Sequence, residues 1–123
     1  MALFTRLTAS LCLSAALSFA GTWSGSLVDS KCYASEQRNV NPTDTLNFVD
    51  RDQNLAIRYC SAKSKTKSFA IVQHNGVSLQ LDIEGNTKAA ALVQKSRKRS
   101  PFAVDFTGEI LGTQVKLDSI QPQ

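Results

Sequence analysis

Apolar and polar residues alternate along several short stretches of this chain, which is the pattern of β-strands that bury one face. The first stretch, residues 22–28, places Trp23, Gly25 and Leu27 on one side. A glycine inside a strand indicates a bend or a close approach of another backbone. We therefore expect a first strand that is distorted, or closely approached, at Gly25.

Residues 69–84 alternate most clearly and predict a β-hairpin. A three-residue loop that ends at Gly76, with this glycine at positive φ, pairs Ile71 with Leu79. A two-residue turn would pair Val72 with Leu79 instead. We favour the first register because it brings the larger side chains together across the strands. The inward-facing residues of the second strand are then Val77, Leu79, Leu81 and Ile83.

Two segments of the chain predict helices. Residues 50–60 form the first, with Asp50 as its N-cap and Cys60 at its end. Residues 85–96 form the second, with Asn86 as its N-cap and a run of alanines that favours helix.

The C-terminal part of the chain predicts a second hairpin. Residues 101–110 alternate again, and a tight turn at residues 111–112 leads into the last strand. This turn sets Phe106 opposite Leu117. The alternation breaks after Leu117, so we expect a β-bulge near residues 118–119.

The predicted order of elements is strand, insertion, strand, strand, helix, strand, strand. A helix between the third and fourth of five strands is the order of the OB-fold, a small Greek-key barrel. Closure also removes the exposed edges that five short strands would leave in an open sheet. A β-sandwich, the alternative, usually has about seven strands. The sequence therefore predicts a mainly β protein, an OB-fold-like five-stranded barrel with short helices.

The N-terminus, residues 1–20, has the pattern of a secretory signal peptide. Arg6 precedes a short apolar run, and small residues at Ala20 and two positions before it fit a cleavage site. The run of about 13 residues is shorter than the ~20 that span a bilayer. A lipoprotein is a further alternative, but cleavage before Cys12 would follow a large residue. We expect a secreted or periplasmic protein, without a membrane span after cleavage, that is one domain over residues 21–123.

Removal of the signal peptide leaves two cysteines, Cys32 and Cys60. In an oxidising compartment such a pair predicts a disulfide. It would tie the polar, turn-rich residues 29–48, which we expect to be irregular, into an insertion between strands one and two. Closing a loop of about 29 residues stabilises a fold by roughly 3–4 kcal/mol. A metal site is the alternative, but the chain has one histidine, His74, and no Cys-x-x-Cys spacing, so we expect no metal and no cofactor.

Three segments of the chain share a wider pattern. A glycine-bearing strand ends in Asp29-x-x-Cys32, and Cys60 stands beside a basic stretch. The final hairpin places aliphatic, aromatic, glycine and serine positions at Val104, Phe106, Gly108, Ile110, Gly112, Val115, Leu117, Ser119 and Ile120. Together these segments resemble a family of small secreted bacterial domains of unknown function. The resemblance implies the OB-like fold, the disulfide and secretion, and it implies no activity.

The charge of the chain is locally concentrated. Its 14 lysines and arginines and 10 aspartates and glutamates give a net charge of +4, and two basic runs, residues 63–67 and 95–99, carry much of the excess. Such runs bind anionic glycans or nucleic acids by releasing counterions, although they are more often solvated loops. No aromatic residues alternate with them to stack on bases, which argues against a nucleic-acid partner.

The sequence offers no evident catalytic constellation. His74 lies in the predicted hairpin turn, both cysteines are expected to be oxidised, and no two carboxylates form an obvious acid–base pair. Residues 50–54 begin like a calcium loop, but Leu55 and Ser61 stand where that loop needs glycine and glutamate. We therefore expect a non-catalytic protein, with a small hydrolase as the last alternative.

A binding or interaction domain is the favoured hypothesis, with an envelope protein or an anionic ligand as its partner. OB-type barrels bind through the face of strands two and three and the adjoining loops. The candidate residues for such a face are Trp23, Tyr33, Arg58, Tyr59, Lys63, Lys65 and Lys67. Structural roles are the alternative: Trp23 in the core, Tyr59 packed behind Cys60, and the lysines simply solvated.

Overall fold

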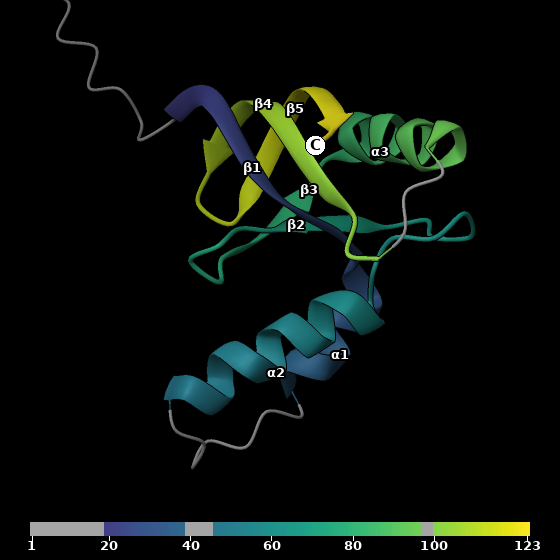
Figure 1. The fold of residues 1–123 in the computed structure, drawn as a ribbon. Helices are drawn as coiled ribbons and strands as arrows, with labels where there is room; N and C mark the ends of the chain where they lie inside the picture. Colours follow the sequence, from purple (N-terminus) through teal and green to yellow (C-terminus); the bar gives the residue numbers. More distant parts are fainter. Residues whose placement is uncertain (1–18, 39–45, 97–99) are drawn as a thin grey trace, which may run out of the picture.

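The computed structural model describes residues 19–38, 46–96 and 100–123. Most of the predicted signal peptide and residues 97–99 of the second basic run lie outside these ranges. Five strands close into a barrel in the order β1-β2-β3-β5-β4 and back to β1 (Figure 1). They are β1 (Phe19–Asp29), β2 (Phe69–Val72), β3 (Ser78–Leu81), β4 (Ala103–Leu111) and β5 (Gln114–Pro122).

The topology is that of an OB-fold. Strands β3 and β5 pair in parallel, and every other neighbouring pair is antiparallel. Helix α3 (Ile83–Lys95) connects β3 to β4 and packs against β3 and β5. The predicted OB-like barrel, with its helix between strands three and four, is therefore confirmed.

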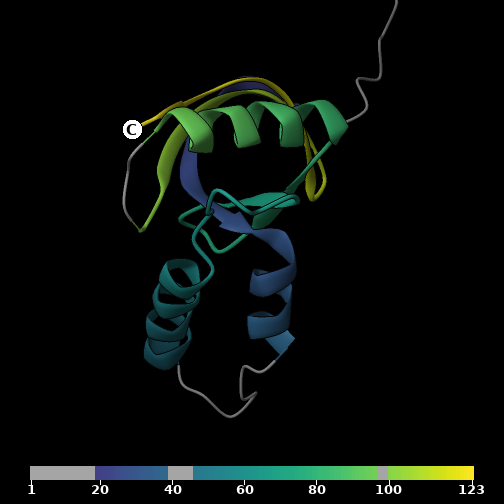
Figure 2. The same cartoon turned by 90° about the vertical axis from the view of Figure 1, so that its right-hand side faces the viewer.

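Two helices form the insertion between β1 and β2, namely α1 (Ser30–Arg38) and α2 (Leu46–Tyr59). Both extend away from the barrel on the side of β2, while α3 lies on another side (Figures 1 and 2). Residues 30–38, which we expected to be irregular, are therefore helical, and the helix predicted over residues 50–60 starts earlier, at Leu46. We call α1 and α2 together the helical arm.

The interior of the barrel holds the larger of two hydrophobic cores. Its buried residues come from all five strands, from α3 and from the adjoining segments: Leu27, Ala62, Phe69, Ile71, Leu79, Leu81, Ala89, Val93, Phe102, Val104, Phe106, Val115 and Leu117. Trp23 is half-buried beside them, and its ring stacks on Phe106 with the ring centroids 5.9 Å apart.

The smaller core lies on the outer face of β1 and β2. Val28, Ala70 and Val72 point out of the barrel there and are covered by residues of the helical arm, Tyr33, Ile57 and Cys60. Side chains alternate between the two faces of a strand, so β2 is buried on both faces. In other OB-type barrels the outer face of this strand is exposed and can bind ligands. In this protein the helical arm covers that face.

The register of the first hairpin agrees with the prediction. Ile71 pairs with Leu79, and Gly76 takes a positive φ of 86° in the connecting turn. Two of the four residues expected to face inward do not, because β3 spans only Ser78–Leu81: Val77 is exposed just before the strand, and Ile83 is 86% exposed in the first turn of α3.

The register of the second hairpin differs from the prediction. The turn lies at Gly112 and Thr113 rather than at residues 111–112, so Leu117 faces Gly108 instead of Phe106. The expected β-bulge is present: Thr107 pairs with Ser119 and Gly108 with Leu117, which leaves Asp118 as the extra residue. An added Cβ at Gly108 would have no room against the Lys116 carbonyl oxygen, so this close crossing requires glycine.

The helices begin at other residues than predicted. Asp29 caps α1 by accepting hydrogen bonds from the backbone N–H groups of Lys31 and Cys32, both at 3.1 Å. Helix α2 begins at Leu46, which places Asp50 inside the helix rather than at its cap. Asp82 caps α3, accepting from Gly85 N at 2.7 Å.

Asn86, the predicted cap of α3, has another role. Its Oδ1 accepts a hydrogen bond from Phe69 N at 2.8 Å and thereby joins the first turn of α3 to the start of β2. A short polar residue near a helix start can bond to a distant backbone as well as to its own helix, and the sequence alone does not distinguish the two.

Candidate functional site

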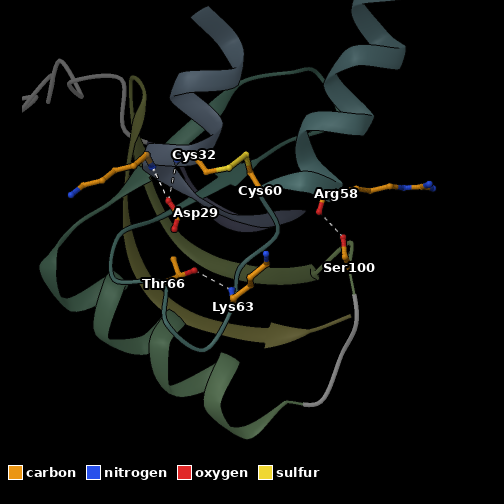
Figure 3. The surroundings of a disulfide bond; sticks show 8 residues. Asp29, Cys32, Arg58, Cys60, Lys63, Thr66 and Ser100 are labelled. Carbon is orange, nitrogen blue, oxygen red and sulfur yellow. Dashed lines mark hydrogen bonds between the residues drawn. A yellow bond between two sulfur atoms is a disulfide. The ribbon is translucent and has the colours of Figure 1, made fainter. Parts of the chain in front are cut away.

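The predicted disulfide between Cys32 and Cys60 is present, with a Cα–Cα distance of 5.5 Å (Figure 3). It joins the first turn of α1 to the residue that follows α2. Cys60 is buried in the smaller core and Cys32 is half-buried against it. The bond therefore fixes the base of the helical arm where the arm meets the barrel.

The chain after Cys60 is held to the end of β1. Asp29 N donates to Cys60 O at 2.7 Å, and Ala62 N donates to Leu27 O at 3.1 Å. Between these bonds, Ser61 forms a β-bridge with Val28. The backbone just before the first basic run is therefore held by hydrogen bonds to β1 and by the disulfide at Cys60.

The first basic run, residues 63–67, forms an ordered turn that we call the basic loop. Lys63 N donates to Thr66 Oγ1, and Thr66 N donates to Lys63 O, both at 3.0 Å. Thr66 is buried, whereas Lys63, Lys65 and Lys67 are exposed. Across the part of the chain that the structure describes, none of the three lysines has a carboxylate partner.

Helix α3 also holds the basic loop in place. Gln94 Nε2 donates a hydrogen bond to the carbonyl oxygen of Ser64 at 3.1 Å. Lys95, the first residue of the second basic run, lies in the last turn of α3. Lys95 therefore lies near the basic loop, although Gln94 and Ser64 are 30 residues apart in sequence.

A groove of about 360 Å³ lies between the basic loop, the C-terminal end of α3 and the start of β4. Its apolar surface comes from Ala62, Val93 and Phe102. The rest of its lining is polar, and the residues concerned are Arg58, Ser61, Lys63, Ser64, Ser96 and Ser100. Ser100 Oγ donates to the carbonyl oxygen of Arg58 at 2.9 Å and so joins α2 to the segment before β4 (Figure 3).

One serine of the groove has a hydroxyl without a protein partner. Ser61 is only 5% exposed as a residue, and its hydroxyl forms no hydrogen bond with any residue of the described ranges. The buried unpaired hydroxyl of these ranges is that of Ser78, so the Ser61 hydroxyl is open to the groove, where a ligand or water can bond to it. Lys63 is exposed, and its ammonium group has no hydrogen-bond partner in the described structure although the Lys63 backbone is fixed.

The candidate ligand residues do not form a single face. Lys63 and Arg58 line the groove, and Lys65 and Lys67 follow Lys63 in the basic loop. The guanidinium group of Arg58, however, points away from Lys63 (Figure 3), so Arg58 contributes mainly its backbone.

Three aromatic candidates are placed elsewhere. Tyr33 is 3% exposed under the helical arm, where burial raises the pKa of its hydroxyl above 10.0. Trp23 packs against Phe106 at the barrel core, as its structural alternative predicts. Tyr59 is 70% exposed at the end of α2 and does not pack behind Cys60. The structure therefore places Trp23 and Tyr33 outside the groove, and the part of the candidate residues in ligand binding stays a prediction.

Two of the basic residues also have a structural role. Arg58 and Lys95 lie in the last turns of α2 and α3, where a cation offsets the partial negative charge of a helix C-terminus. The three lysines of the basic loop have no helix end to neutralise, so their charge is available to a ligand.

The lining residues missed by sequence reasoning are mostly serines. Ser61, Ser64, Ser96 and Ser100 each flank or belong to one of the basic runs. Their one sequence signal is that serines stand in or beside both basic runs, a pattern that indicates solvated loops equally well. The pattern becomes informative only when the fold brings residues 61–64 next to the end of α3.

The described part of the chain shows neither a metal centre nor a membrane-spanning helix. There, no three or more histidine, cysteine, aspartate or glutamate residues are grouped so as to hold a metal ion. Nor does any helix in these ranges have the length and apolar character to cross a membrane.

Comparison with known proteins adds no relative: no protein family, curated protein or solved structure matches this chain. The resemblance of its segments to a family of small secreted domains stays a prediction.

Proposed function

We propose that this protein is an exported, non-catalytic binding domain that holds an anionic ligand at the groove beside the basic loop. The disulfide supports export, because such bonds form and persist in oxidising compartments. The signal-peptide pattern of residues 1–20 supports the same address. Cleavage after Ala20 would leave Gly21, which pairs with Gly108, as the first residue of β1.

The ordered basic loop is the observation that carries the proposal. A solvated loop of lysines loses conformational entropy when it binds, whereas a loop already fixed before binding does not. The turn of Lys63 and Thr66, together with the bond from Gln94 to Ser64, fixes this loop next to a groove that is lined by serine and lysine residues. Cations held in this way attract an anion at little cost of ordering.

A protein partner is the second candidate function, and one observation favours it. Leu55 and Tyr59, one helical turn apart on α2, are 56% and 70% exposed. Exposed apolar side chains at this spacing lie on one face of a helix and can contact another protein. The helical arm would then bind an envelope protein while the groove binds the anion.

Binding to immobilised heparin tests the anionic-ligand function. We expect the wild-type protein to be retained at low salt and to elute by about 0.5 M salt, because polyanion binding falls steeply with ionic strength. The double variant Lys63→Gln/Lys65→Gln should elute at clearly lower salt. The variant Lys31→Gln/Lys116→Gln, which removes the same charge from exposed lysines outside the groove, should elute close to the wild type.

Two results would contradict this function. Equal shifts for the two double variants would mean that net charge alone causes retention, and no retention at low salt would mean that the protein does not bind polyanions. Export is tested separately by mass spectrometry of the protein from its native host, where a mature chain that begins at Gly21 is expected and one that begins at Met1 is not.

A further inference from the structure

We propose that the ligand of the groove is an acidic polysaccharide, with one sugar ring against the serine hydroxyls and the flanking acidic groups on the lysines of the basic loop. This inference rests on the anion-binding function proposed above and names the chemistry of its ligand.

The hydroxyl groups of the groove match those of a sugar. Four of its lining residues are serines, namely Ser61, Ser64, Ser96 and Ser100. A serine hydroxyl donates one hydrogen bond and accepts others, as sugar hydroxyls do, whereas a sulfate, phosphate or carboxylate group only accepts. Ser61 is the strongest of these positions because the residue is only 5% exposed, while its hydroxyl has no hydrogen-bond partner in the described ranges and is not among the buried polar atoms.

The size and apolar surface of the groove fit one ring of a polymer. Its volume of about 360 Å³ is at the lower end of the ~300–1,000 Å³ of small-molecule sites. Ala62, Val93 and Phe102 lie at the apolar base of the groove and are 9%, 9% and 2% exposed, so they offer the C–H groups of a sugar ring a small apolar contact rather than a stacking surface. The groove is therefore suited to a single ring, with the rest of the polymer lying outside it.

The positions of the cations indicate that the ligand carries charge beyond that ring. Lys63 lines the groove, and Lys65 and Lys67 continue from it along the basic loop. Lys95 lies at the end of α3, which forms another side of the same groove. A polymer with an acidic group on most of its sugars would contact several of these lysines at once.

The aromatic residues argue against nucleic acid as the ligand. Proteins that bind single strands stack the bases on exposed aromatic side chains. Phe102 is the aromatic residue of the groove and is 2% exposed, while Tyr59 is exposed but does not line the groove. The outer face of β2, a base-binding surface in other OB-type barrels, is covered by the helical arm. A strand of nucleic acid could therefore bind here only through its phosphate charges.

Titration with two matched polyanions tests this inference. The probes are a heparin-derived hexasaccharide and a single-stranded oligothymidylate with the same number of negative charges, each measured by calorimetry at one salt concentration. We expect the hexasaccharide to bind at least tenfold more tightly. Ser61→Ala should weaken hexasaccharide binding about two- to tenfold, the effect of one hydrogen bond, and should leave oligothymidylate binding unchanged.

A second variant guards against an effect of Ser61 on folding. Ser64 is exposed, so Ser64→Ala should keep the fold and also weaken the hexasaccharide selectively. Ser35→Ala, an exposed serine on α1, is the matched control and should bind both probes like the wild type.

Each contrary result has a distinct meaning. Equal affinity for the two probes, or serine variants that bind the hexasaccharide like the wild type, would overturn the polysaccharide as ligand. If Lys63→Gln/Lys65→Gln nevertheless weakens both probes, the anion-binding function stands without it. If neither probe binds at low salt, both proposals fall.

Discussion

Gln94 on α3 donates its side-chain amide to the carbonyl oxygen of Ser64, 30 residues earlier in the chain, at 3.1 Å. This bond holds the basic loop against the end of α3, where the second basic run begins at Lys95, beside one groove. Its removal should therefore affect binding more than stability.

For Gln94→Ala we expect heparin affinity to fall about two- to tenfold, the effect of one lost hydrogen bond on the ordering of the loop, with little change in melting temperature. Calorimetric titration and thermal melting measure the two effects. Gln37→Ala, an exposed glutamine on α1, is the control. An unchanged affinity would show that the turn of Lys63 and Thr66 orders the loop without help from α3.

The disulfide belongs to the smaller core, so its loss should loosen the helical arm before the barrel. A bond that closes a loop of this length contributes roughly 3–4 kcal/mol, or well over ten degrees of melting temperature at ~4–8 °C per kcal/mol. For Cys32→Ser/Cys60→Ser we expect the helical circular-dichroism signal to melt earlier by this amount.

Hydrogen exchange of the same variant shows where the stability is lost. Amides of α1 and α2 should lose protection, while those of β4 and β5 keep most of theirs because the barrel has its own core. Unchanged melting would mean that the bond adds nothing, and an equal loss of protection in all elements would mean that the two cores unfold together.

The crossing of β4 and β5 depends on Gly108. An added Cβ there would collide with the backbone of Lys116 and Leu117, and backbone atoms in a paired strand have little room to move. We expect Gly108→Ala to lower the free energy of unfolding by about 3 kcal/mol. Gly112→Ala, at a φ of 63° with open space around it, should cost only about 1 kcal/mol. Equal losses in urea denaturation would show that the strands can separate slightly at the bulge.

Stability should fall at alkaline pH because of Tyr33. Burial raises the pKa of its hydroxyl above 10.0 in the folded protein, so the folded state holds this proton more tightly than the unfolded state does. The resulting stabilisation is complete below pH 10 and is lost as the pH rises from there through the folded-state pKa. Tyr33→Phe should flatten the pH dependence of the free energy of unfolding in this range. Gln37→Ala, which changes an exposed residue that does not titrate, is the control and should leave the dependence as it is.

The features that could be predicted from the sequence are those set by local patterns. The alternation of apolar and polar residues, together with Gly76, predicted the pairing of Ile71 with Leu79. The break in that alternation after Leu117 predicted the bulge, which lies at Asp118. The two cysteines left after the predicted signal peptide indicated the disulfide. In each of these cases neighbouring residues carry the whole signal.

The features that could not be predicted depend on distant contacts. Helix α1 has few strong helix-forming apolar positions, and it is stabilised by its cap at Asp29, the disulfide and the packing of Tyr33. Tyr33 was expected at a ligand face for the same reason: nothing nearby in sequence shows that β2 will lie beneath it. The groove depends on the meeting of residues 61–64 with α3, which only the closed barrel brings about.

The double burial of β2 has an evolutionary consequence. A strand with one free face can acquire a new contact by a single polar substitution, but Phe69, Ala70, Ile71 and Val72 all lie inside packed apolar surroundings. Any change of specificity in this molecule must therefore arise in its connecting segments, whose residues can vary without disturbing either core. Natural variants of the chain should accordingly keep these four positions apolar while the residues around the groove diverge.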